Sequence, residues 1–138
     1  MRYKIKQKFF SFTDDFTIKD ENDTDYFIVK GKFLSFGDKF RIEDLNGNEL
    51  AYIEQEVFRF LPEYNIYSSG QHLAQVKKEL TFFKPNFRIS SSYGDYQMYG
   101  DFFAHEFQII KNGIVVATVS KKWFSFSDTY MVDIRNEE

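Results

Sequence analysis

A short aromatic phrase recurs along the chain every 20 to 24 residues, and this periodicity constrains the fold more than any other feature. Its clearest copy runs from Lys32 to Ile42 and reads Lys-Phe-Leu-Ser-Phe-Gly-Asp-Lys-Phe-Arg-Ile. The other copies begin at Lys8, Glu56, Glu79, Tyr99 and Lys122. A fixed period of this size predicts that one supersecondary unit is repeated and stacked on its neighbours.

Each copy of the phrase is typical of a β-hairpin, because aromatic and β-branched residues alternate with polar ones on both sides of a three-residue break. In the clearest copy one strand ends at Phe36, the next begins at Phe40, and Gly37-Asp38-Lys39 lies between them. Six hairpins predict twelve strands, and 138 residues then leave about 11.5 per strand and turn. This spacing is within the ~8–12 residues expected of sandwiches and barrels. No linker divides the chain, so we expect one all-β domain over residues 1–138.

Bulk properties exclude several classes of protein. Aromatic residues make up 20% of the chain, which supplies enough apolar area for a core. The net charge of −3 argues against a general nucleic-acid binder, and the absence of cysteine excludes disulfides and thiolate sites. No apolar run approaches the ~20 residues of a membrane helix. Residues 1–6 alternate in polarity instead of forming the apolar core of a signal peptide, so the sequence predicts a cytoplasmic protein.

A second, shorter phrase follows several of the expected turns and places alanine at an equivalent position. The copies centre on Ala51, Ala74 and Ala117, each preceded by Leu or Val. The first follows Asn46-Gly47, which is the strongest short signal for a hairpin turn. A small residue repeated at one position predicts crowding against something inside the fold.

Several phrases together resemble the LURP-one-related proteins. These phrases are Lys32-Phe33-Leu34-Ser35-Phe36, Gly100-Asp101-Phe102, Val116-Ala117-Thr118-Val119-Ser120-Lys121-Lys122-Trp123 and Ser127-Asp128-Thr129-Tyr130. The resemblance covers nearly the whole chain. It implies the tubby C-terminal-like fold, which phospholipid scramblases are thought to share distantly. That fold is a closed antiparallel barrel of twelve strands with a hydrophobic C-terminal helix through its middle.

The sequence departs from this family in its C-terminal helix, because residues 135–138 end the chain where the helix would start. A barrel of twelve strands is wider than the eight-stranded barrel that side chains can fill. It leaves room for an object about as wide as a helix, roughly 10–12 Å. Three occupants follow as alternatives: the chain's own aromatic side chains, a partner, or an apolar ligand. We favour a short form of the fold packed by its own aromatic residues.

One stripe of basic residues is a candidate lipid-binding site. Arg2, Lys4, Lys6 and Lys8 fall on one face of the first expected strand. Each Lys or Arg near an anionic membrane surface contributes ~1 kcal/mol of attraction. The alternative is a solvated strand face on which lysine discourages edge pairing. No headgroup-binding residue of tubby-type domains can be matched to a position here.

No catalytic or metal-binding set is found. Asp14, Asp38 and Asp128 recur in equivalent breaks, where hairpins need turn-forming residues, so we interpret them as structural. His72 and His105 are the only histidines, and neither has a second histidine at metal-ligand spacing. A nucleophile elbow, a Walker loop and a dinucleotide-binding glycine motif are all absent. The sequence therefore predicts no enzyme, no metal and no cofactor.

Two hypotheses about function follow. The first is a non-enzymatic binding or scaffold module that docks reversibly on anionic phospholipid, at the periphery of a membrane, or on a protein. The alternative is a carrier that holds a hydrophobic small molecule in the barrel lumen. Neither hypothesis predicts the oligomeric state.

Overall fold

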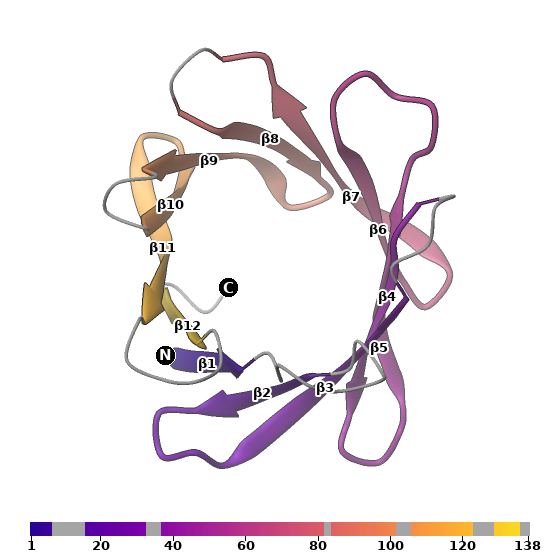
Figure 1. The fold of residues 1–138 in the computed structure, drawn as a ribbon, viewed down its shortest axis with the longest axis vertical. Helices are drawn as coiled ribbons and strands as arrows, with labels where there is room; N and C mark the ends of the chain where they lie inside the picture. The colour runs from indigo at the N-terminus through magenta and orange to yellow at the C-terminus, as the bar shows by residue number, and fades with distance from the viewer. Residues whose placement is uncertain (7–15, 33–36, 82–83, 102–105, 123–128, 136–138) are drawn as a thin grey trace.

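Twelve β-strands form the whole of the described architecture in a computed structural model of the chain (Figure 1). The structure describes residues 1–6, 16–32, 37–81, 84–101, 106–122 and 129–135. The strands are β1 (Arg2–Lys6), β2 (Phe16–Asp20), β3 (Asp25–Lys32), β4 (Lys39–Asp44), β5 (Glu49–Gln55), β6 (Glu63–Ser68), β7 (Gln71–Glu79), β8 (Asn86–Ser91), β9 (Gly94–Asp101), β10 (Glu106–Lys111), β11 (Ile114–Lys122) and β12 (Thr129–Ile134).

Every strand pairs antiparallel with the strand that follows it, and β12 pairs with β1 to close the barrel. The seam is held at its end by two backbone bonds. The amino terminus of Met1 donates to the Ile134 carbonyl at 2.7 Å, and the Ile134 amide donates back to Met1 at 2.9 Å. The first and last strands, β1 and β12, consequently lie side by side in the ring (Figure 1). The predicted closed, twelve-stranded, antiparallel all-β barrel is confirmed, and the described residues include no helix.

The six recurring phrases span the connections from odd to even strands. The phrase that begins at Lys32 joins β3 to β4, and the one that begins at Glu56 joins β5 to β6. In the described part of these phrases, the carbonyl groups of Asp38, Pro62 and Pro85 each accept a backbone bond of 2.8–3.0 Å from the next odd strand. The middle residue of each three-residue break thus adds one backbone hydrogen bond to the ladder, just before an even strand begins. Asp14, His105 and Asp128 lie outside the described residues.

Tight polar turns join even strands to odd strands at the opposite end of the barrel. The Asp44 carboxylate accepts the backbone N–H groups of Asn46 and Asn48, each at 2.9 Å. Asp20 accepts from residues 22 and 24 in the same geometry. Asp20 and Asp44 are 24 residues apart, so the same type of turn recurs after one period of the sequence repeat. The Asn-Gly turn predicted at residues 46 and 47 is confirmed.

The pairing register divides each strand into an apolar face and a polar face. The apolar face carries the residues that close the described copies of the phrase, which are Ile18, Ile42, Ile66, Ile89, Ile109 and Val132. The opposite face carries most of the charged side chains of the strands, for example Lys30, Arg41 and Arg88, all exposed. Since charged groups stay in water, the apolar face is the inner wall of the barrel.

Candidate functional site

The inner wall is the largest apolar surface of the barrel, and it contains small residues at regular places. Ala51 lies opposite Ile42, Ala74 opposite Ile66, and Ala117 opposite both Ile109 and Ile134. Ala74 and Ala117 are buried at 6% and 7% exposure, whereas Ala51 is half-buried. The predicted crowding is therefore found at two of the three alanines. It comes from isoleucine side chains on the neighbouring strands.

Most of the inner wall nevertheless keeps accessible surface. Val29, Ala74 and Ala117 are the buried apolar residues on the described part of this wall, and no large described side chain is fully buried. The half-buried wall residues include Phe16, Phe27, Phe40, Ile53, Tyr64, Val76, Phe87, Tyr96, Met98, Phe107, Val119 and Tyr130. A close-packed core would bury such side chains almost completely. The aromatic residues that the structure describes therefore do not close the interior by themselves, and the packing that we favoured from the sequence stays a prediction.

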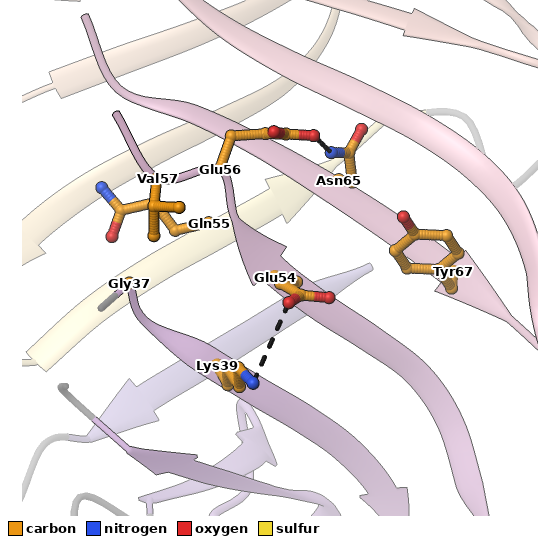
Figure 2. Close-up of a pocket in the computed structure, with 8 residues that line it drawn as sticks. All are labelled: Gly37, Lys39, Glu54, Gln55, Glu56, Val57, Asn65 and Tyr67. Atoms are coloured by element: carbon orange, nitrogen blue, oxygen red, sulfur yellow. Dashed lines mark hydrogen bonds and ion pairs between the residues drawn. The ribbon is translucent and has the colours of Figure 1, made fainter. Parts of the chain in front are cut away.

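A polar pocket of about 420 Å³ lies on the outer face, over β4, β5 and β6 (Figure 2). Its lining consists of Gly37, Lys39, Glu54, Gln55, Glu56, Val57, Asn65 and Tyr67. Gly37 has φ of 111°, and a Cβ there would lie 3.0 Å from both the Gln55 carbonyl oxygen and the Val57 side chain. Only glycine lets the β3–β4 connection pass so close to β5.

Buried amide contacts fix one side of this pocket. Asn65, 7% exposed, donates through Nδ2 to Glu56 Oε1 at 2.6 Å (Figure 2), and its Oδ1 lies 2.9 Å from Nε2 of His72. The His72 ring in turn meets the Tyr67 ring edge-on, with 5.4 Å between centroids. His72 is thus bound into a network with Asn65 and Tyr67.

The remaining polar groups of the pocket hold fixed charges without an acid–base pair. Lys39 and Glu54 form an ion pair with 3.9 Å between Nζ and Oε1. Two tyrosines outside the pocket lining, Tyr52 on β5 and Tyr64 on β6, have raised pKa values, because burial and nearby carboxylates both disfavour the phenolate. Both phenols consequently stay protonated at neutral pH and can exchange hydrogen bonds but not act as bases. Among the described residues no group of three acidic or histidine side chains could hold a metal ion.

The predicted basic stripe lies on β1, where Arg2 and Lys4 already have carboxylate partners. Arg2 Nε lies 3.4 Å from Asp133 Oδ2, and Lys4 Nζ lies 3.2 Å from Asp23 Oδ1. Lys6 is the last residue of β1, and Lys8 lies outside the described residues. The strand places these residues in a row, as predicted. Neighbouring carboxylates offset two of the charges.

Sequence reasoning missed a different exposed feature, the connection between β5 and β6. Phe58 and Phe60 on this connection are 100% and 92% exposed. We had interpreted the aromatic residues as core because they occur at strand period. One signal could have distinguished Phe58 and Phe60 from core residues. Arg59 stands between them, at a position where three other copies of the phrase have serine.

Comparisons with other proteins agree on a family and on a fold. A family model described as LURP-one-related matches residues 1–138. Uncharacterized protein YxjI of Bacillus subtilis (strain 168) is 40% identical over 134 residues, which are 97% of this chain and 82% of that protein. An X-ray structure of a protein from Arabidopsis thaliana has a TM-score of 0.64 at 15% identity. The match covers 96% of this chain and 80% of the plant chain, and it supports the fold alone.

No helix in the described ranges is long and apolar enough to cross a bilayer.

Proposed function

Because this chain belongs to the LURP-one-related family and has a partly accessible apolar inner wall, we propose that it is a binding module whose barrel holds an elongated apolar guest. This is the carrier hypothesis of the sequence analysis, and it includes no enzymatic step. A cytoplasmic location remains a prediction from the sequence.

The observation that carries the proposal is the half-buried state of the wall on all twelve strands. Of the apolar side chains that the described strands place on this wall, only Val29, Ala74 and Ala117 are buried, although a wall of this composition would gain about 25 cal/mol for each Å² removed from water. A guest that covers this wall would therefore be stabilised without any directional contact. An acyl chain fits such a surface, since it offers apolar area along its length.

The test uses a pair of tryptophan reporters at adjacent residues. Met98 on β9 lies on the inner wall opposite Ile109, while Gln97 is exposed on the outer face. Met98→Trp and Gln97→Trp are each made in a Trp123→Phe background, so that one indole reports. Titration with a brominated long-chain fatty acid should quench the Met98→Trp emission and leave the Gln97→Trp emission nearly unchanged.

Native mass spectrometry gives an independent readout. The unmodified chain mixed with oleate should show a one-to-one complex. Equal quenching of the two reporters, or only the free mass at saturating oleate, would contradict a guest on the inner wall.

Docking on anionic lipid through Arg2, Lys4, Lys6 and Lys8 remains a prediction. The pairing of Arg2 with Asp133 and of Lys4 with Asp23 makes this stripe a weaker candidate than the inner wall.

A further inference from the structure

The β5–β6 connection presents two phenylalanine side chains to solvent. Phe58 is 100% and Phe60 92% exposed, and Val57 beside them is 41% exposed. Leu80, on the β7–β8 connection, is 71% exposed. Both connections lie at the same end of the barrel, because β6 begins beside the end of β7, with Glu63 opposite Lys77. This end therefore carries apolar side chains that no described part of the fold covers.

The backbone at Phe58 indicates that this exposure is not incidental. Phe58 has φ of 60°, a left-handed conformation that a bulky L-residue rarely adopts. Strain of this kind persists where the surrounding structure over-determines it, and it occurs most often at functional segments. The ring of Phe58 contacts nothing that would offset the strain inside the fold, since it is fully exposed.

The charge around the two rings favours an anionic surface. Arg59 stands between them and is 56% exposed, with only long ion pairs of 3.9 Å to Glu56 and 3.7 Å to Glu63. Lys84, on the neighbouring connection, is also exposed. The opposite end of the barrel is acidic and includes Asp20, Glu21, Asp23, Asp25, Asp44, Glu49 and Asp95. This asymmetry would orient the phenylalanine-bearing end toward negative charge.

The sequence places similar residues in every odd-to-even connection. The links between these strand pairs contain Phe9-Phe10-Ser11-Phe12, Phe33-Leu34-Ser35-Phe36, Val57-Phe58-Arg59-Phe60, Leu80-Thr81-Phe82-Phe83, Phe102-Phe103 and Trp123-Phe124-Ser125-Phe126. The even-to-odd turns are instead mainly polar, although they include the exposed side chains of Leu45 and Tyr93. Since all odd-to-even connections of a closed antiparallel barrel meet at one end, the described apolar side chains of two of them, Val57, Phe58, Phe60 and Leu80, are presented at the same end.

We propose that this protein docks reversibly on anionic lipid bilayers through the β5–β6 connection, with Phe58 and Phe60 inserted into the interfacial region and Arg59 and Lys84 at the headgroups. Aromatic side chains are favoured at that depth, and cations near an anionic leaflet add to the attraction. The inference does not depend on whether the barrel holds a guest. It also involves a different surface from the basic stripe, which lies on β1.

Tryptophan placed at the two ends of the barrel tests the proposal directly. Phe58→Trp is compared with Tyr93→Trp, which replaces an aromatic residue that is 70% exposed in the β8–β9 turn at the opposite end. Both carry Trp123→Phe. On phosphatidylcholine vesicles containing about one-third phosphatidylglycerol, the Phe58→Trp emission should shift to the blue and the Tyr93→Trp emission should not. Vesicles of phosphatidylcholine alone should give a much smaller shift.

Co-sedimentation with the same vesicles measures the contribution of each group. Phe58→Ala and Phe60→Ala should each weaken partitioning by about ten-fold, as expected for withdrawing a phenylalanine from an apolar phase. Lys84→Glu should weaken it on anionic vesicles only, and Tyr93→Ala should leave it unchanged. Circular dichroism is expected to show every variant folded, because the replaced side chains are exposed.

Three results would overturn the proposal: no partitioning of the unmodified chain onto anionic vesicles, partitioning that the Phe58→Ala/Phe60→Ala double variant retains in full, or an equal blue shift for the Tyr93→Trp control. The vesicle measurements use no oleate, so failure of the docking proposal and failure of the guest proposal can be distinguished.

Discussion

Ala74 on β7 lies directly opposite Ile66 on β6, at the last matched pair before the ladder shifts register toward Tyr67 and His72. Only 6% of Ala74 is exposed. The equivalent ladders shift after Ile18, Ile42 and Ile109, so an isoleucine and a local irregularity recur together around the barrel. The bulge increases the local twist of the strand and brings the isoleucine over its small neighbour.

Ala74→Leu should destabilise the barrel by about 1–3 kcal/mol, because extra methylenes in a filled site force strain. Ala51→Leu is the matched control. It occupies the equivalent position on β5 but is half-buried, so its cost should be smaller. Urea unfolding followed by circular dichroism measures both. Equal costs for the two substitutions would show that Ala74 is no more crowded than Ala51.

The period of the fold could be predicted from the sequence because it depends on local signals. Turn formers such as Asp44 and the aromatic alternation determine where strands begin and end, and both are visible within a few residues. Closure of the barrel was expected from the resemblance to a family. The register shifts could not be predicted, since one extra residue in a ladder leaves no mark in the composition of either strand.

The sequence also could not separate Phe40 from Phe58. Both belong to runs in which aromatic and polar residues alternate, but Phe40 follows the break in its copy of the phrase and lies within β4 on the half-buried wall, whereas Phe58 precedes the break in its copy and lies on a connection in solvent. The β5–β6 connection keeps residues 56–62 outside the ladder, so its aromatic residues leave the wall.

The buried amide of Asn65 predicts a measurable loss of stability on truncation. Asn65→Ala removes the hydrogen bonds of a buried amide to Glu56 and His72, whose own side chains reach solvent, so the expected loss is about 0.5–1.5 kcal/mol for each bond removed. Gln108→Ala, on the exposed face of β10, should change the free energy of unfolding by less than about 0.5 kcal/mol. The prediction is wrong if the two variants unfold at the same urea concentration.

Asp44 should make the barrel less stable in acid. Hydrogen bonds from the Asn48 side chain and backbone, joined by those from Asn46 and Gly47, lower the pKa of the Asp44 carboxyl below its ordinary value. A carboxyl with a lowered folded-state pKa stabilises the fold above its unfolded pKa. That contribution is lost as the pH falls through the folded pKa.

Asp44→Asn should therefore reduce the dependence of the urea midpoint on pH in the acid range. The control is Glu21→Gln, a turn carboxylate that is exposed in the β2–β3 turn. It should leave the acid dependence close to that of the unmodified chain. An unchanged pH profile for Asp44→Asn would mean that the turn hydrogen bonds do not favour the charged carboxylate.

Two opposite changes of charge test whether the β1 stripe contacts lipid. Lys4→Glu with Lys6→Glu should reduce partitioning onto anionic vesicles if the stripe contacts lipid, by ~1 kcal/mol for each cation lost. Asp23→Asn removes the carboxylate 3.2 Å from Lys4 and should have the opposite effect. Vesicle co-sedimentation reports both. No response to either change would confine docking to the other end of the barrel.

Phe58→Gly should raise the stability of the barrel while it weakens docking. Glycine adopts the φ of 60° found at Phe58 without the clash of a Cβ, and a left-handed conformation costs an L-residue roughly 1–2 kcal/mol. The fully exposed ring contributes nothing to the core that the substitution could remove. The greater freedom of glycine in the unfolded chain offsets part of the gain, so the expected increase is about 0.5–1 kcal/mol.

Phe60→Gly is the control. Phe60 is not among the described residues with positive φ, so glycine there should bring no gain in stability, although it removes an equally apolar ring. If Phe58→Gly is more stable and no longer partitions onto anionic vesicles, then the strained conformation of Phe58 is needed for docking on lipid and not for the stability of the barrel. A Phe58→Gly variant less stable than the unmodified chain would instead mean that the ring has a structural role.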